Sequence, residues 1–167
     1  MTPEQIQTLK TFALADQTAA GYIAAGSDGL LAAWFNEATA FIVYRTNVPR
    51  IEIQNETGTG GAGGTASEWD WTVYKGQSVS EQGAWRDMAM GDGINFSKIK
   101  VREGIAKIFT GTGAVAAMRN HILSFATRTA NRVEQALAVG TGTPASPATM
   151  AYEGTIDASV AMQIRVA

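Results

Sequence analysis

The chain has 167 residues and a formal net charge of −2, which argues against nucleic acid as the main partner because duplex binding usually needs a basic excess. It contains no cysteine, which excludes disulfide bonds and thiolate metal sites. The N-terminus lacks a basic flank and no window approaches about 18 apolar residues, so we expect a cytoplasmic product without signal peptide or membrane span, folded as a single domain over residues 1–167.

Residues 1–39 are predicted to form a layer of three short helices. The opening Thr2-Pro3-Glu4-Gln5 places proline at the first helical position and glutamine where it completes a capping box with Thr2. Asp16 is a cap for the second helix, and Gly26-Ser27-Asp28 separates it from a third, which carries Trp34 and Phe35.

Residues 40–77 are predicted to form an irregular β-hairpin-like extension. The run 41–46 is β-branched and aromatic, the run 50–54 alternates apolar and polar residues, and the run 69–74 has aromatic residues at alternate positions. Between the last two runs, five glycines within residues 56–67 predict a flexible glycine-rich loop.

Residues 78–140 are predicted to form the helical core. It begins with a capping box between Ser78 and Glu81, and a second helix follows after Ser97. From Thr112 to Gly140 the apolar residues recur at spacings of three and four. This pattern predicts one helix of roughly 25 residues, about 38 Å long, around which the remainder packs.

Residues 141–167 are predicted to form an extended tail that begins with a proline-containing, solvated segment. Its end has two alternatives: Asp157 caps a final short helix, or the chain stays extended to its end. The predicted fold class is therefore mainly α, a helical bundle around the long helix of the C-terminal half, with the β extension and the tail added to it.

No catalytic, cofactor or metal site is predicted. His121 is the only histidine and has no acidic residue three or four positions away, so we interpret it as a structural histidine. No nucleophile elbow occurs, and the acidic residues are scattered. Gly58–Gly63 matches the dinucleotide pattern G-x-G-x-x-G, but no helical period follows it and a tract this rich in glycine matches almost automatically. We therefore expect a protein that is not an enzyme and carries no cofactor.

Charge is sparse and unevenly distributed. Only 17% of the residues are charged, which is typical of a surface that another subunit covers, or of a monomer that associates non-specifically. Residues 1–77 hold eight acidic and four basic residues, whereas residues 78–139 hold five acidic and eight basic ones. The basic face is either solvated and paired with acids, or it meets DNA or an acidic partner such as the N-terminal half of a neighbouring copy.

Several segments resemble a family of small structural proteins of tailed bacteriophages and prophages. The resemblance is carried by Ala33-Trp34-Phe35-Asn36, by Phe41-Ile42-Val43-Tyr44-Arg45-Thr46-Asn47-Val48, and by the segment 127–149, which includes Thr127-Arg128-Thr129-Ala130-Asn131-Arg132-Val133-Glu134 and Val139-Gly140-Thr141-Gly142-Thr143-Pro144. The layout of a helical bundle with an extended insertion is similar to that of head–tail connector, or adaptor, proteins. Residues 49–77 depart most from the family pattern.

The resemblance implies a virion protein assembled in the host cytoplasm. Such connectors form a ring, typically of about twelve copies, below the portal protein and join it to the next neck or tail protein, with DNA passing through the lumen. The alternatives are a capsid decoration or head-completion protein and a tail-terminator ring. Trp69 and Trp71 are interpreted either as partner anchors or as ordinary core. The predicted interface residues are Arg45, Trp69, Trp71, Arg119, Arg128 and Arg132.

Overall fold

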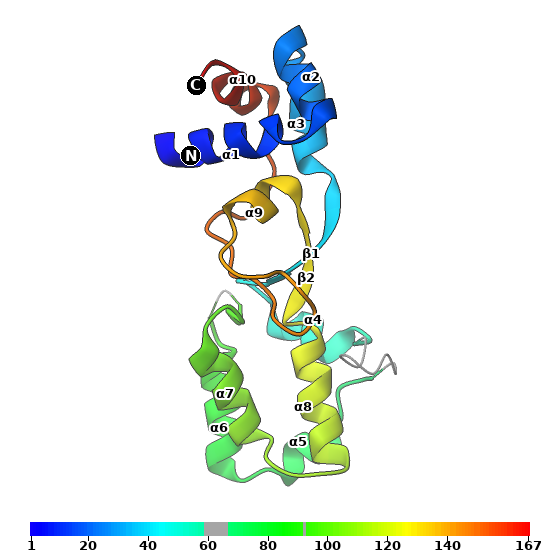
Figure 1. The fold of residues 1–167 in the computed structure, drawn as a ribbon. Helices are drawn as coiled ribbons and strands as arrows, with labels where there is room; N and C mark the ends of the chain where they lie inside the picture. Colours follow the sequence, from blue (N-terminus) through cyan, green and yellow to red (C-terminus); the bar gives the residue numbers. More distant parts are fainter. Residues whose placement is uncertain (59–66, 92) are drawn as a thin grey trace. The chain divides into compact units, whose positions relative to one another are not determined.

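The structure is a computed structural model that describes residues 1–58, 67–91 and 93–167 (Figure 1). The described residues form ten helices and one two-stranded antiparallel sheet, which confirms the prediction of a mainly helical fold. The chain forms two compact units: unit 1 consists of Met1–Val43 and Thr129–Ala167, and unit 2 of Tyr44–Arg128. The organisation as a single domain stays a prediction, because compactness does not decide whether the two units fold separately. None of the described helices is both long and apolar enough to cross a membrane.

Five helices build unit 1, and local caps begin several of them. They are α1 (Pro3–Leu14), α2 (Gln17–Ala25), α3 (Asp28–Asn36), α9 (Arg132–Leu137) and α10 (Ala158–Val166). Thr2 and Gln5 form the predicted capping box at α1, and Asp16 accepts from two amides at the start of α2. Asp157 caps α10 through the amide of Val160, at 2.9 Å, which decides between the two alternatives for the tail in favour of a helix.

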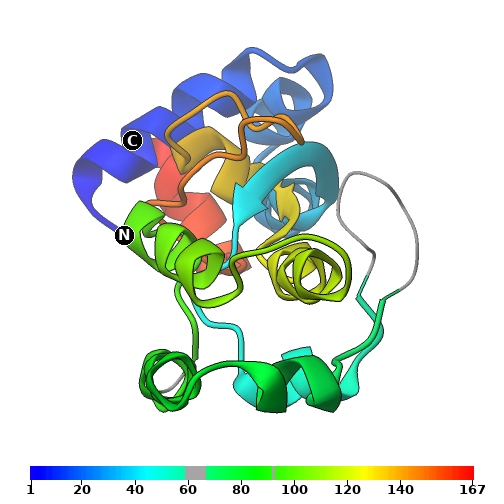
Figure 2. The same ribbon diagram turned by 90° about the horizontal axis from the view of Figure 1, so that it is seen from below.

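The core of unit 1 forms where α3 packs on α10 and α1 packs on α9. Both views show α10 (red) beside α1 (dark blue) (Figures 1 and 2). Two polar contacts hold α3 to the C-terminal segment. The Asn36 side chain donates to the Ile156 carbonyl at 2.8 Å and accepts from its amide at 2.9 Å, while Arg165 donates to both carboxylate oxygens of Asp28 at 2.7 and 3.1 Å. The C-terminal segment is therefore part of the folded core.

The two strands are β1 (Ala38–Tyr44) and β2 (Thr127–Asn131). On the unit 1 side the Thr39 hydroxyl donates to the Ala130 carbonyl at 2.9 Å. Val43 is fully buried with two alanines, Ala130 and Ala148, and forms a parallel bridge with the second of them. The strand predicted over 41–46 is thus present, although it begins at Ala38 and ends at Tyr44.

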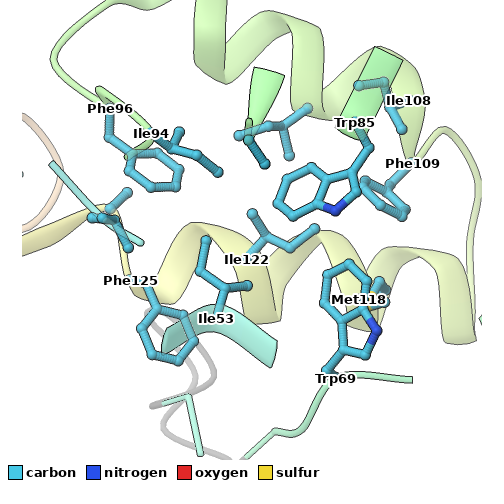
Figure 3. Close-up of a cluster of buried hydrophobic side chains, with 14 residues drawn as sticks. Ile53, Trp69, Trp85, Ile94, Phe96, Ile108, Phe109, Met118, Ile122 and Phe125 are labelled. Carbon is cyan, nitrogen blue, oxygen red and sulfur yellow. The ribbon is translucent and has the colours of Figure 1, made fainter. Parts of the chain in front are cut away.

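Unit 2 contains α4 (Arg50–Asn55), α5 (Trp71–Gly76), α6 (Val79–Met88), α7 (Ile99–Ile108) and α8 (Ala114–Ser124). In Figure 2, α6 and α8 are seen nearly end-on. Ile122 of α8 and Trp85 of α6 point into one apolar cluster with Ile105 and Phe109 (Figure 3). The capping box predicted for Ser78 and Glu81 is present at the start of α6.

The predicted long helix from Thr112 to Gly140 is wrong. The segment forms three elements instead: α8 ends at Ser124, β2 follows, and α9 begins at Arg132. The break has a local cause. Asn131 accepts from the amide of Glu134 at 2.9 Å and its own amide donates to the Glu134 carboxylate at 3.1 Å, so a capping box starts a new helix inside the apolar period.

The predicted β extension over residues 40–77 is wrong beyond β1. Residues 50–54 are helical in α4, where Ile53 is buried and Ile51 is exposed, so the apolar residues of the alternating pattern do not share one face of a sheet. Residues 71–76 are helical in α5, because the Asp70 carboxylate accepts from the amides of Thr72 and Val73 at 2.8 and 3.1 Å. The glycine-rich loop and the dinucleotide-like match fall mostly on 59–66, outside the described residues.

Candidate interaction surfaces

Trp69 belongs to the core of unit 2. Only 8% of it is exposed, and its ring lies 5.4 Å from the ring of Trp85 and 6.4 Å from that of Phe109 (Figure 3). Of the two interpretations of this residue, ordinary core fits its burial. Its role as a partner anchor stays a prediction that the isolated chain does not support.

Trp71 differs from its neighbour because 51% of it is exposed. It packs edge-on against Trp69, with ring centroids 5.7 Å apart, and against Tyr74, at 5.8 Å. The two tryptophans do not share a strand face, since α5 begins at Trp71. An exposed indole held in place by aromatic neighbours loses little side-chain entropy on contact with a partner, so Trp71 keeps its candidacy as an interface residue.

The predicted interface arginines of unit 2 are engaged with other groups. Arg45 donates with both terminal nitrogens to Glu52, at 2.5 and 2.9 Å, and only 24% of its side chain is exposed. Arg119 donates to the carbonyl of Phe109 at 2.9 Å, and Arg128 also has a partner. These contacts are structural, and an interface role would require the same side chains to serve a second purpose.

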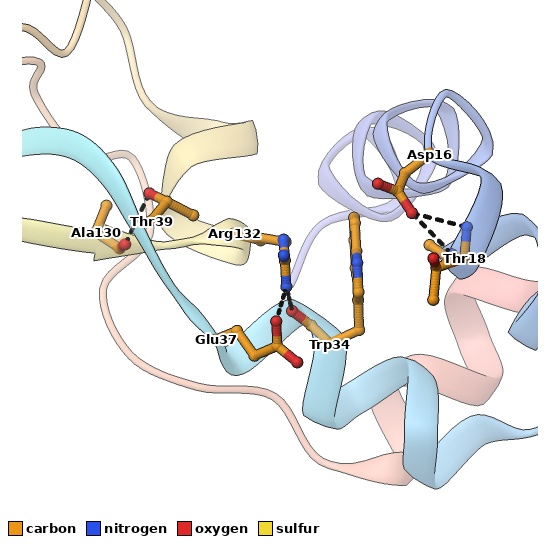
Figure 4. A network of polar contacts seen from close by, with 8 residues as sticks. Asp16, Thr18, Trp34, Glu37, Thr39, Ala130 and Arg132 are labelled. Carbon is orange, nitrogen blue, oxygen red and sulfur yellow. Dashed lines mark hydrogen bonds and ion pairs between the residues drawn. The ribbon is translucent and has the colours of Figure 1, made fainter.

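Arg132 of unit 1 is the most thoroughly held of the predicted interface residues. Its guanidinium lies over the Trp34 ring, 4.6 Å from the ring centre, donates to the Trp34 carbonyl at 2.8 Å and pairs with Glu37 (Figure 4). These contacts join the start of α9 to the end of α3. Within unit 2 the structure brings Trp69 and Trp71 together, with ring centroids 5.7 Å apart, whereas Arg132 belongs to the other unit.

His121 is fully buried in unit 2 and hydrogen-bonded at both ring nitrogens. Its Nε2 lies 2.6 Å from the Ile53 carbonyl oxygen, and its Nδ1 lies 3.1 Å from the hydroxyl and 3.1 Å from the carbonyl oxygen of Ser67. Because a carbonyl only accepts, Nε2 donates to the Ile53 carbonyl, while Nδ1 lies within hydrogen-bond distance of both the hydroxyl and the carbonyl oxygen of Ser67. This arrangement fits a structural histidine that ties α8 to α4.

The described polar side chains do not assemble a metal site: within residues 1–58, 67–91 and 93–167, no three His, Asp or Glu side chains lie close enough together to hold an ion. The buried carboxylate of Glu134 instead accepts from the amides of Asn131 and Gly154, at 3.1 and 2.9 Å. It holds the turn before α10 to the start of α9.

Unit 1 carries an open groove that the sequence did not predict. It has a volume of about 580 Å³, an apolar floor formed by Phe12 of α1 and Ala136 of α9, and a polar rim formed by Glu4, Gln7, Thr8 and Thr11. The rim has a sequence signal, because its residues recur at helical spacing and face away from the buried Ile6, Leu9 and Ala13. The floor has none, since α9 reaches α1 only through the fold.

Glu4 is the charged residue of the groove rim. Hydrogen bonds from its own backbone amide and from the Thr2 hydroxyl hold the pKa of its carboxyl below the usual range. The carboxylate is therefore ionised at neutral pH, at the helix end where the dipole favours negative charge.

The two units carry net charges of opposite sign. Unit 1 holds seven acidic and three basic residues and unit 2 holds eight acidic and ten basic residues, which gives formal net charges of −4 and +2. The three basic side chains of unit 1 are all engaged: Lys10 donates to the Arg165 carbonyl, Arg132 pairs with Glu37, and Arg165 pairs with Asp28. Several lysines of unit 2 are exposed on or beside α7, namely Lys98, Lys100 and Lys107.

Comparison of the chain with protein families, with curated proteins and with solved structures found no match.

Proposed function

We propose that the chain is a structural subunit of a tailed-phage virion, a head–tail connector that forms a ring below the portal around the DNA channel. The observation that supports this most is the opposite charge of the two units, −4 and +2. A subunit with complementary surfaces at two places makes head-to-tail contacts with copies of itself, and such contacts close into a ring when the rotation between copies allows it.

The contacts of the polar side chains agree with this role. The histidine, the buried glutamate and most of the predicted interface arginines hold one helix or turn to another. An assembly subunit needs such a rigid body, because rigid surfaces lose less conformational entropy when they associate. The neighbours in the assembly would be copies of the chain, the portal and the next neck or tail protein, with DNA in non-specific proximity.

The copy number per virion tests this proposal against its alternatives. Quantitative mass spectrometry of purified particles, scaled to the portal, should give one copy of the chain for each portal subunit, about twelve per particle. Hundreds of copies would instead assign the chain to capsid decoration, and about six copies would assign it to a tail-terminator ring. Absence from the purified particle would overturn a structural role in the virion.

A further inference from the structure

We propose that neighbouring copies in the assembly meet through α7 of one copy and the α1 groove of the next. This inference rests on the proposed function, because it names the contact that would repeat around the ring. Its two sides are the exposed N-terminal end of α7 in unit 2 and the groove lined by α1 and α9 in unit 1.

The α7 side presents an apolar side chain between two cations. Ile99 is 58% exposed, whereas Ile105 and Ile108 of the same helix are buried in the unit 2 core. The neighbours Lys98 and Lys100 are both exposed. The Lys98 ammonium has no hydrogen-bond or ion-pair partner within the described part of the chain, and Lys100 pairs only with the exposed Glu103, at 2.9 Å. Exposed pairs of this kind contribute little, so Lys100 is free to change partner.

The groove side offers an apolar floor and one acidic side chain. Phe12 and Ala136 supply an apolar floor for Ile99, and the ionised Glu4 on the rim supplies a charge opposite to the two ammonium groups. Gln7, Thr8 and Thr11 supply polar atoms around the floor, as at an interface whose apolar centre has a polar rim.

Charge complementarity identifies the occupant as a second copy of this chain. The segment 98–107 holds four basic residues and one acidic residue, and it belongs to the unit of net charge +2, while the groove belongs to the unit of net charge −4. Both halves of the contact are thus present on every copy. Each copy then binds one neighbour through α7 and a second neighbour through its groove, so the same contact repeats from copy to copy.

Disulfide trapping tests the contact directly, because the chain contains no cysteine of its own. A Thr8→Cys chain and an Ile99→Cys chain of different tag length are mixed under assembly conditions and oxidised. We expect the mixed dimer within minutes, and a matched mixture of Thr8→Cys with Lys75→Cys, an exposed lysine of α5, should form at least tenfold less of it. Equal trapping in the two mixtures, or none in either, would overturn the contact.

Charge reversal gives a second readout that does not depend on oxidation. Glu4→Lys alone and the pair Lys98→Glu with Lys100→Glu should each reduce the ring fraction in native mass spectrometry at least tenfold, and combining the three changes should restore it. Circular dichroism of each variant checks that the helices are retained. A wild-type ring that none of these variants alters would overturn this contact and leave the connector proposal standing. A wild-type chain that forms no ring, alone or with the portal, would overturn both.

Discussion

The Nε2 of His121 lies 2.6 Å from the carbonyl oxygen of Ile53, inside unit 2, where no part of the imidazole is exposed. Its Nδ1 lies 3.1 Å from the hydroxyl of Ser67, a residue that forms an antiparallel bridge with Gly58. A single ring therefore satisfies backbone and hydroxyl groups from α4 and from the residues that follow the glycine-rich segment. We expect this histidine to contribute to stability and not to chemistry.

Replacing His121 by alanine should destabilise the chain by about 2–4 kcal/mol, because the change leaves the Ile53 carbonyl unpaired and opens a cavity in a packed core. Ser67→Ala, which removes one of the two partners of Nδ1 and little volume, should cost about 1 kcal/mol or less. Urea unfolding followed by circular dichroism measures both. A His121→Ala variant as stable as the wild type would show that the ring is dispensable for packing.

Gly58 has no room for a side chain. A Cβ at this position would lie 2.5 Å from the Ser124 Oγ and 2.8 Å from the His121 Nδ1, although the backbone conformation of Gly58 is open to any residue. Gly58→Ala should therefore destabilise the chain by about 1–3 kcal/mol through overpacking. Adding Ser124→Ala should recover part of this loss, and a double-mutant cycle in urea measures the coupling. Strict additivity of the two changes would contradict the predicted contact.

The ion pair between Asp28 and Arg165 makes stability depend on pH. The hydrogen bonds from the Arg165 guanidinium hold the pKa of the Asp28 carboxyl below its usual range. A carboxyl whose pKa is lower in the folded state contributes stability at pH values above its unfolded pKa, and that contribution is lost as the pH falls through the folded value. The wild type should therefore be more stable than Asp28→Asn at neutral pH, and the difference should vanish in acid. Thermal unfolding at a series of pH values checks this, and a difference that persists unchanged in acid would contradict it.

Substitution of Arg132 distinguishes a structural role of this residue from an interface role. Arg132→Lys keeps the charge but loses the planar group that lies over Trp34, so we expect a loss of about 1 kcal/mol in the stability of the chain. Lys107→Ala, at an exposed lysine, is the control and should change stability by less than about 0.5 kcal/mol. If Arg132→Lys left stability unchanged and abolished assembly, the residue would belong to an interface, as the sequence alone had suggested.

Features with local causes were predictable from the sequence. The caps at Thr2, Asp16 and Ser78 were found correctly because each depends on residues within three positions of the cap. The break after Ser124 was not found, because the apolar spacing continues from Ile122 through the buried Val133 although a strand lies between them. That strand exists through pairing with a segment about 90 residues earlier in the chain, which no local period records.

The candidate surfaces were predictable only in part. The exposure of the predicted arginines and tryptophans depends on tertiary partners, such as Glu52 for Arg45 and Trp85 for Trp69. The groove was not predictable because Phe12 and Ala136, which form its floor, are far apart in the sequence. The exposure of Ile99 was not predictable either, because the same helix carries two isoleucines, Ile105 and Ile108, that are buried.

Native mass spectrometry of the purified chain with the portal protein tests the central claim most directly. The connector proposal predicts a closed ring of the chain bound to the portal ring, with one copy for each portal subunit. A chain that stays monomeric at concentrations well above those of the assembly reaction, and that does not bind the portal, would contradict it.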